Sequence, residues 1–237
     1  CQVDALGYEY DLKKEPDTDY VRRPWNEHVF PRLNLTVVST FQPFLLFSAF
    51  RLKPTPISFN RLAPQLESLL EKRADALVLN LGHWAALNSG AYTPGLRKNS
   101  TWVYRKYQLL FKTVLEHLDA WFLRHAPLGY RPLVLFKSTT GRHFEKGDWF
   151  AGGRCLRREP IPFPLPANYN STGNEYTERQ NRIMGNVLRK RQFLYDVLYL
   201  DTTEFDHQRA DGHANPIDCL HWMHPGLPDY INVFVAS

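Results

Sequence analysis

Short apolar runs alternate with longer helical stretches along this chain. The runs predict strands over residues 35–41, 75–80, 133–136 and 193–200. The last three are mainly apolar, which is typical of strands buried on both faces of a sheet. Helical patterns cover residues 62–72, 103–125 and 177–192. Strands that alternate with helices in this order indicate an α/β fold with a mostly parallel sheet.

Polar clusters follow three of the predicted strands. They contain Asn80 and His83, then residues 138–143, and then Asp201 with the later Arg209, Asp211 and His213. Ligands of open α/β sheets bind beyond the carboxyl ends of the strands. We therefore expect the chemistry of this protein at that edge.

Composition favours one globular domain over residues 1–237. The chain has 237 residues, of which 43% are hydrophobic, enough for one substantial core. Its formal net charge is +5, and the basic residues are scattered rather than arranged in a stripe, so no nucleic-acid partner is expected. No stretch has the apolar length of a transmembrane helix.

The sequons of this chain favour a secretory compartment. Asn34, Asn99 and Asn170 each begin an N-x-[ST] sequon and are candidate glycosylation sites. The three cysteines are an odd number, which leaves at least one without a partner in the chain. A disulfide between Cys155 and Cys219 would stabilise the fold by roughly 4 kcal/mol on the chain-entropy model. It would also fix the residue next to Asp218.

Asp218 and His221 are the first candidates for catalysis. They lie three residues apart in a segment rich in Pro and Gly, which does not favour a regular helix. A carboxylate that holds an imidazole in one tautomer allows it to act as a general base toward a hydroxyl. The alternative is an aspartate that caps a turn beside a partly buried histidine, and the residues alone leave both interpretations open.

Three separated blocks resemble the plant trichome-birefringence-like family of polysaccharide O-acetyltransferases, also described as PC-esterases of the SGNH/GDSL hydrolase superfamily. The blocks are LVLNLGHW at 77–84, HFEKGDWFAGGRC at 143–155, and a third from 200 to 229. The third contains RADGH at 209–213, DCLHW at 218–222 and PGLPD at 225–229. The resemblance implies a three-layer α/β/α SGNH-hydrolase-like fold.

The resemblance also implies roles for individual residues. His221 would be the general base, Asp218 would orient it, and Asn80 would donate to the oxyanion, with Gly82 and His83 beside it at the substrate. A loop histidine that only shapes the turn is the alternative for His83. Three tryptophans could offer faces to sugar rings, although buried packing is the commoner role of this side chain. They are Trp84, Trp149 and Trp222. Arg209, Asp211 and His213 resemble a structural network of the family.

The resemblance further implies a polysaccharide or glycan acceptor, an acetyl donor as co-substrate without a bound cofactor or metal, and location in the Golgi lumen. A carbohydrate acetylesterase, with water as the acceptor, would use the same triad. A catalytically silent polysaccharide-binding relative is another alternative. A metal site built from His83, His143, His213 and Asp211 is a further one, although the spacings match no recognised ligand pattern.

The chain departs from the family at the nucleophile. Its only Gly-Asp pair, at 147–148, is followed by Trp149, so the Gly-Asp-Ser block is absent. We expect that block, the first strand of the sheet and any membrane anchor to precede Cys1, which makes these residues an N-terminally truncated domain. Ser138 is the only internal substitute with a plausible position. Met223 stands where plant members usually carry a second cysteine.

Overall fold

The computed structural model describes eleven parts of the chain. They are residues 2–3, 9–10, 26–30, 34–39, 62, 64–82, 100–125, 129–145, 152–162, 174–213 and 216–222. The helices are α1 (Pro64–Glu71), α2 (Ser100–His125), α3 (Asn174–Arg189) and α4 (Thr203–Gln208), with a 3-10 helix at Ala210–Gly212. The strands are β1 (Gln2–Val3), β2 (Glu9–Tyr10), β3 (Asn26–Phe30), β4 (Leu35–Ser39), β5 (Ala76–Asn80), β6 (Leu133–Lys137) and β7 (Asp196–Leu200).

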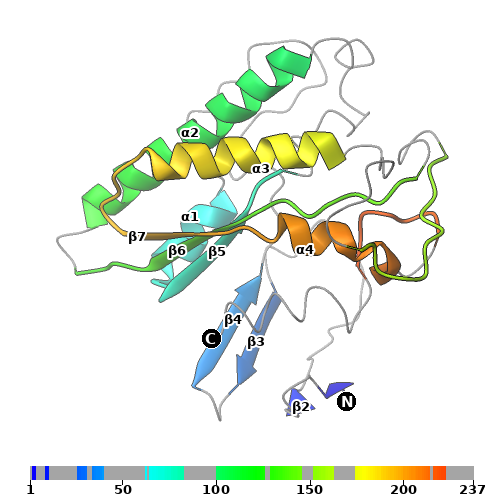
Figure 1. Cartoon of the computed structure of the whole chain (residues 1–237). Helices are drawn as coiled ribbons and strands as arrows, with labels where there is room; N and C mark the ends of the chain where they lie inside the picture. The colour runs from blue at the N-terminus through cyan, green and yellow to red at the C-terminus, as the bar shows by residue number, and fades with distance from the viewer. Residues whose placement is uncertain are drawn as a thin grey trace.

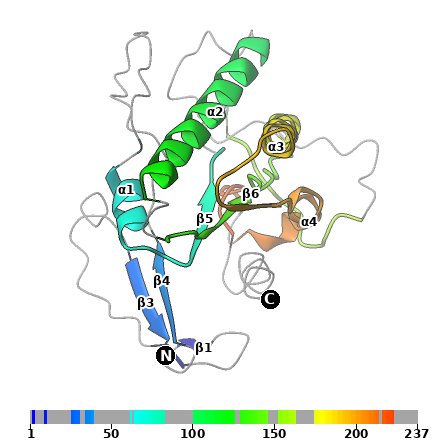
Figure 2. The ribbon, with the colours of Figure 1, turned by 90° about the vertical axis from the view of Figure 1, so that its left-hand side faces the viewer.

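A parallel sheet with the order β5-β6-β7 forms the centre of the described structure. Its register places Val78, Leu135 and Leu198 in one row. The α2 and α3 helices lie side by side and connect successive strands of this sheet (Figures 1 and 2). The α/β class with a mostly parallel sheet, predicted from the alternating pattern, is therefore confirmed.

One hydrophobic core joins the sheet to three helices. Leu77 and Leu79 of β5 and Phe136 of β6 pack with apolar side chains of α1, α2 and α3. The α2 helix contributes most because its apolar residues recur every three or four positions. The fully buried ones are Phe111, Val114, Leu115 and Leu118.

The opposite face of the sheet is less covered than the sequence predicts. Val78 is 51% exposed and Leu198 is 54% exposed, whereas Leu135 between them is buried. The prediction of strands buried on both faces is thus wrong for β5 and β7 and right for the middle of β6. The physical reason is that α1, α2 and α3 share the core on one face of the sheet.

Two short antiparallel ladders lie outside the central sheet. The predicted strand at 35–41 is β4, which ends at Ser39 and pairs with β3 from Phe30↔Leu35 to Asn26↔Ser39. Residues 26–30 show no clear periodicity, so β3 was not predicted. Asn34, in the turn between them, has a φ of 48°, a left-handed conformation that asparagine adopts more readily than most residues. The β1 and β2 strands pair in the same antiparallel sense.

The segment after β7 carries the main element that the sequence did not predict. Thr203–Gln208 forms α4, which is too short for an apolar period to be visible and buries Asp206 and His207. In Figure 1 this helix continues from the carboxyl end of β7, and the orange segment after it lies beyond the same end of the sheet. None of the helices in the described ranges is long and apolar enough to span a bilayer.

Candidate active site

Asp218 and His221 are in direct contact. The His221 Nδ1 atom lies 3.0 Å from Asp218 Oδ1 and 2.9 Å from Asp218 Oδ2. The His221 side chain is 75% exposed, whereas that of Asp218 is 24% exposed. An imidazole whose Nδ1–H donates to a carboxylate presents Nε2 as the nitrogen that can take a proton from a hydroxyl. This geometry is that of a general base with its orienting carboxylate.

The local chain conformation holds the Asp218 carboxylate in place. The backbone N–H groups of Leu220 and His221 donate to Asp218 Oδ1 over 3.3 Å and 3.1 Å. Burial raises the pKa of the Asp218 carboxyl, but the hydrogen bonds from His221 and Leu220 outweigh it and hold the pKa below its ordinary value. Asp218 thus accepts hydrogen bonds from the backbone of a turn and also contacts the imidazole, while the general-base role of His221 stays a prediction.

A disulfide fixes the loop that carries these residues. Cys155 and Cys219 are bonded, with Cα atoms 5.6 Å apart. Both are buried in a small cluster with Phe144, against which Leu220 packs. The Cys155 N–H donates to the Pro216 carbonyl over 2.9 Å. Backbone and sulfur contacts therefore hold the loop immediately before His221.

Asn80 stands at the end of β5, where the oxyanion donor was expected. Its Nδ2 group donates to the carbonyls of Lys137 and Ser138 over 3.1 Å and 2.8 Å. Nearby Gly82 is buried, and a Cβ at that position would overlap the Thr139 hydroxyl, so only glycine fits. In this conformation the Asn80 amide ties β5 to the end of β6. Its role toward an oxyanion stays a prediction.

The loop after β6 links the Asn80 end of the sheet to the catalytic candidates. The carbonyl of Ser138 accepts from Asn80, and the N–H of His143 donates to the Cys219 carbonyl over 3.2 Å. Asn80 and Cys219, which lies between Asp218 and His221 in the sequence, therefore contact the same short loop, as expected for residues at the carboxyl edge of a parallel sheet.

Ser138 belongs to a buried polar network. Its side chain is fully buried, and its hydroxyl lies 3.0 Å from that of Thr202, which donates to Asp206 over 2.8 Å. Lys137 Nζ lies 3.8 Å from the same carboxylate. A buried hydroxyl held in this way is not accessible to a polysaccharide, so Ser138 does not fit the role of a substitute nucleophile.

Two buried histidines meet near the catalytic loop. His143 Nδ1 lies 2.8 Å from His213 Nε2, and Trp222 stacks on His213 with ring centroids 4.5 Å apart. One face of Trp222 is therefore taken by an imidazole. Arg209 donates two hydrogen bonds to Asp211, in keeping with a structural network. The sequence suggested a chemical role for His143 and His213 only in the alternative metal site, and both stand in the blocks that carry the family resemblance.

The arrangement gives no support for the alternative metal site. His143 and His213 contact each other directly instead of converging on one point, and Asp211 is engaged by Arg209. Among the described residues no three His, Cys, Asp or Glu side chains converge.

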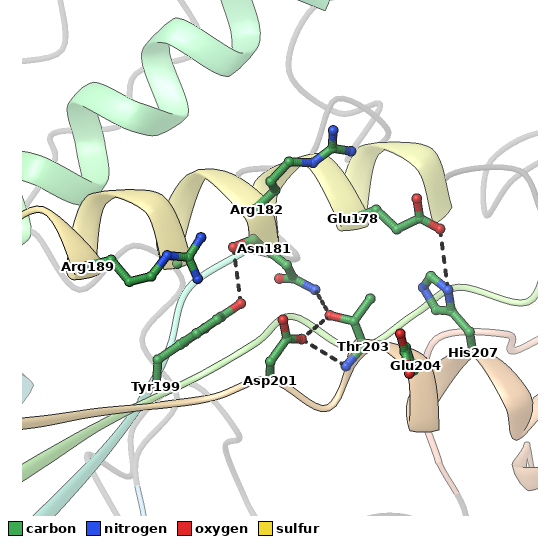
Figure 3. Close-up of a pocket in the computed structure, with 10 residues that line it drawn as sticks. Glu178, Asn181, Arg182, Arg189, Tyr199, Asp201, Thr203, Glu204 and His207 are labelled. Carbon is green, nitrogen blue, oxygen red and sulfur yellow. Dashed lines mark hydrogen bonds and ion pairs between the residues drawn. The ribbon is translucent and has the colours of Figure 1, made fainter.

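A hollow lies between α3, β7 and α4 (Figure 3). Its polar walls are largely bonded to each other: His207 Nδ1 lies 3.4 Å from Glu178 Oε1, and Asp201 accepts from Thr203. Neither Asp218 nor His221 lines it. The hollow thus borders the carboxyl edge of β7 without containing the catalytic candidates.

Several predicted residues fall outside the described ranges. They are His83, Trp84, Trp149, Asn99, Asn170 and Met223. Asn34 is described and exposed in its turn, a position that a glycan can reach.

The stability of the protein should fall on acidification. Burial lowers the pKa of His143 to about 3 and that of His207 to about 4. Below about pH 6.5 these imidazoles take protons in the unfolded chain but not in the folded one. Each therefore lowers the free energy of unfolding by about 1.4 kcal/mol for every unit by which the pH falls. Burial raises the pKa of Asp206 to about 6, which acts in the opposite direction because the folded carboxyl binds its proton first.

Urea unfolding at pH 7, 6 and 5 measures this dependence. We expect the free energy of unfolding to fall across the series, less steeply in His207→Asn and more steeply in Asp206→Asn. A wild-type value that is constant or rises toward pH 5, or variants with slopes equal to that of the wild type, would contradict the assignment.

Comparison with known proteins covers almost the whole chain. Residues 9–237 match the model of PC-Esterase, described as a GDSL/SGNH-like acyl-esterase family found in Pmr5 and Cas1p. Protein trichome birefringence-like 9 of Arabidopsis thaliana is 30% identical over 229 residues, which cover 86% of this chain and 52% of that protein.

Two further proteins of Arabidopsis thaliana are similar to this chain, one over less than half of it and one over its full length. Protein trichome birefringence-like 13 is 35% identical over 116 residues, which are 44% of this chain and 27% of that protein. Protein trichome birefringence-like 14 is 26% identical over 270 aligned positions, which span 100% of this chain and 62% of that protein. The chain therefore spans less than two thirds of the length of each of these relatives.

Proposed function

This chain belongs to the PC-esterase family of GDSL/SGNH-like acyl-esterases, and on that premise we propose that it transfers acetyl groups to polysaccharide hydroxyls through a covalent acyl-serine. The observation that carries the proposal is the contact of His221 Nδ1 with the Asp218 carboxylate. The His221 side chain is 75% exposed. A histidine held in this way can reach a hydroxyl on a large substrate at the surface.

The two halves of the reaction use the same base. The serine oxygen attacks the acetyl carbonyl of the donor while His221 Nε2 takes the hydroxyl proton, which then passes to the leaving group. In the second half a sugar hydroxyl loses its proton to His221, attacks the acetyl-serine ester, and the proton returns to the serine oxygen. Asp218 stabilises the imidazolium that forms in each half.

We place the nucleophilic serine outside these 237 residues. The Gly-Asp-Ser motif of the family does not occur in the sequence, and Ser138 is fully buried against Thr202. Asn80 would serve as an oxyanion donor by releasing one of its two carbonyl contacts, and one such donor typically lowers the barrier by a few kcal/mol. The proposal needs an acetyl donor as co-substrate and no bound cofactor.

Hydrolysis is a second candidate function, favoured by one observation. The exposed His221 imidazole is open to water as well as to a sugar hydroxyl. Water in place of the sugar would release acetate from the acetyl-serine, which makes the protein an acetylesterase. The same catalytic residues serve both reactions, so the acceptor distinguishes them.

We place the reaction in the secretory pathway, in the Golgi lumen. The Cys155–Cys219 disulfide supports this placement because disulfides persist in oxidising compartments. The exposed Asn34 sequon is accessible to glycosylation. A glycan on Asn34, detected by mass spectrometry of the natural protein, supports the placement, and unmodified sequons at Asn34, Asn99 and Asn170 would contradict it.

An acetyl-transfer assay on the intact protein tests the proposed function. The probe is 4-nitrophenyl acetate labelled in its acetyl group, with a deacetylated soluble polysaccharide as acceptor. Label in the polysaccharide above the level in a protein-free control is the expected result. Labelled acetate alone would replace the proposal with the esterase. Neither product, with binding of the polysaccharide retained, would identify a silent binding protein.

A further inference from the structure

Two buried imidazoles form a hydrogen-bonded chain that ends on the backbone of His221. His213 Nδ1 lies 2.7 Å from the His221 carbonyl oxygen, and His213 Nε2 lies 2.8 Å from His143 Nδ1. At the far end, His143 Nε2 lies 3.2 Å from the His207 carbonyl oxygen. Only 1% of His143 and 4% of His213 are exposed, so these contacts are largely removed from water.

The number of available protons limits the tautomers of His143 and His213. Both ends are carbonyl oxygens, which can only accept, so the three contacts require three N–H protons. Two neutral imidazoles carry two. His143 is neutral at ordinary pH because burial lowers its pKa to about 3. One of the three contacts is therefore without a proton.

The distances indicate which contact that is. The two contacts of His213 are 2.7 Å and 2.8 Å, whereas the contact of His143 with the His207 carbonyl is longer, at 3.2 Å. The protons then lie on His213 Nδ1 and His143 Nδ1. His143 donates to His213, which in turn donates to the His221 backbone. All the donors of this hydrogen-bonded series therefore point toward His221.

Other contacts fix the same loop to the same two histidines. The His143 backbone N–H donates to the Cys219 carbonyl over 3.2 Å. His213 forms an isolated antiparallel bridge with Trp222, whose ring stacks on it at an interplanar angle of 25°. His143 and His213 thus hold residues on both sides of His221, while its exposed side chain depends on that backbone for its direction.

We propose that His143 and His213 are positioning residues for His221: His213 holds the His221 backbone in the orientation that brings the imidazole to Asp218, and His143 sets the tautomer of His213. The kinetic consequence rests on the proposed function, whereas the tautomers and the loop geometry do not. His143 acts on His213 as an orienting carboxylate acts on the histidine of a triad, by fixing which nitrogen carries the proton.

Asparagine and glutamine variants separate this role from simple packing. The amide nitrogen of Asn can occupy the place of Nδ1, and that of Gln the place of Nε2. His213→Asn therefore keeps a donor toward the His221 carbonyl, whereas His213→Gln places its donor toward His143. A pair that only fills space would tolerate both variants equally.

The first measurement needs no turnover. Histidine-selective ¹⁵N labelling and long-range ¹⁵N–¹H correlation spectra of the intact protein give the tautomer of each imidazole. We expect Nδ1–H forms for His143, His213 and His221 in the wild type. His213→Gln should leave His221 as a mixture of tautomers, whereas His213→Asn should preserve its Nδ1–H form. An Nε2–H form of His213 in the wild type, or an unchanged His221 in His213→Gln, would overturn the proposal.

The second measurement is the kinetics of acetyl release from 4-nitrophenyl acetate. We expect kcat to fall at least tenfold in His213→Gln with little change in KM, and to stay within about threefold of the wild type in His213→Asn. Equal kcat values in both variants would overturn the positioning role. If the wild type has no turnover, the proposed function fails and the spectra alone decide the positioning role. If His213→Gln does not fold, His143→Gln takes its place, with loss of the Nδ1–H form of His213 as the expected result.

Discussion

Replacing His221 with alanine should lower kcat for acetyl turnover by about a thousandfold or more, with little change in the affinity for polysaccharide. Without the imidazole, no group at this position takes the proton from the attacking hydroxyl, and a neutral serine is a poor nucleophile. Stability should change little because the side chain is 75% exposed. Initial rates of acetyl release and polysaccharide binding by calorimetry measure the two quantities.

Asp218→Asn tests the partner of the same pair. An amide lacks the charge that stabilises the imidazolium, and its NH2 group can select the wrong tautomer of His221, so a loss of similar size is expected. The kcat of the double variant should be close to that of His221→Ala alone, because the two residues act as one unit. His117→Ala, a histidine change on α2, is the control and should keep wild-type turnover. Turnover retained in His221→Ala would exclude the proposed mechanism.

Loss of the Cys155–Cys219 disulfide should be the largest single loss of stability. The bond joins residues 64 positions apart, and a loop of that size corresponds to roughly 4 kcal/mol on the chain-entropy model. For a protein of this size that corresponds to a fall in Tm of about 10 °C. Differential scanning calorimetry of Cys155→Ala and Cys219→Ala without reductant gives the value.

The single and double variants separate the bond from the loss of the side chains. Each single variant breaks the same bond, so the double variant should lose little more than either one. Reductant should lower the Tm of the wild type toward that of the variants and leave the variants unchanged. Additive losses in the double variant would show that packing of the two buried side chains, and not the bond, supplies the stability.

The disulfide and the histidine pair restrain the same short loop from different sides. Cys155 holds Cys219, which precedes His221 by two residues, and His213 holds the His221 carbonyl. This loop also lies at the carboxyl edge of the parallel sheet, where the sequence placed the chemistry. The exposure of His221 is therefore compatible with a defined direction, because the backbone beneath the side chain is fixed at several points.

Sequence patterns predicted the central elements because their signals are local. The apolar period of 103–125 corresponds to α2 at Ser100–His125, and the run at 133–136 corresponds to β6 at Leu133–Lys137. The run at 193–200 was less accurate, since β7 begins at Asp196. Phe193 and Tyr195 belong to the hydrophobic core without being part of the strand. An apolar run does not show whether a residue lies within the strand or packs in the core outside it.

By itself the sequence determined the α/β class, the edge of the sheet that carries the polar clusters, and the family to which the chain belongs. It also placed Asp218 three residues before His221, and a contact at that spacing depends mainly on the local turn. Only the tertiary structure decided which strand faces are covered, that Ser138 is buried, and that Asn80 donates to two carbonyls. It alone joined His143 to His213, 70 residues later. Such contacts depend on how segments far apart in the sequence pack together, and a pattern of neighbouring residues carries no information about that packing.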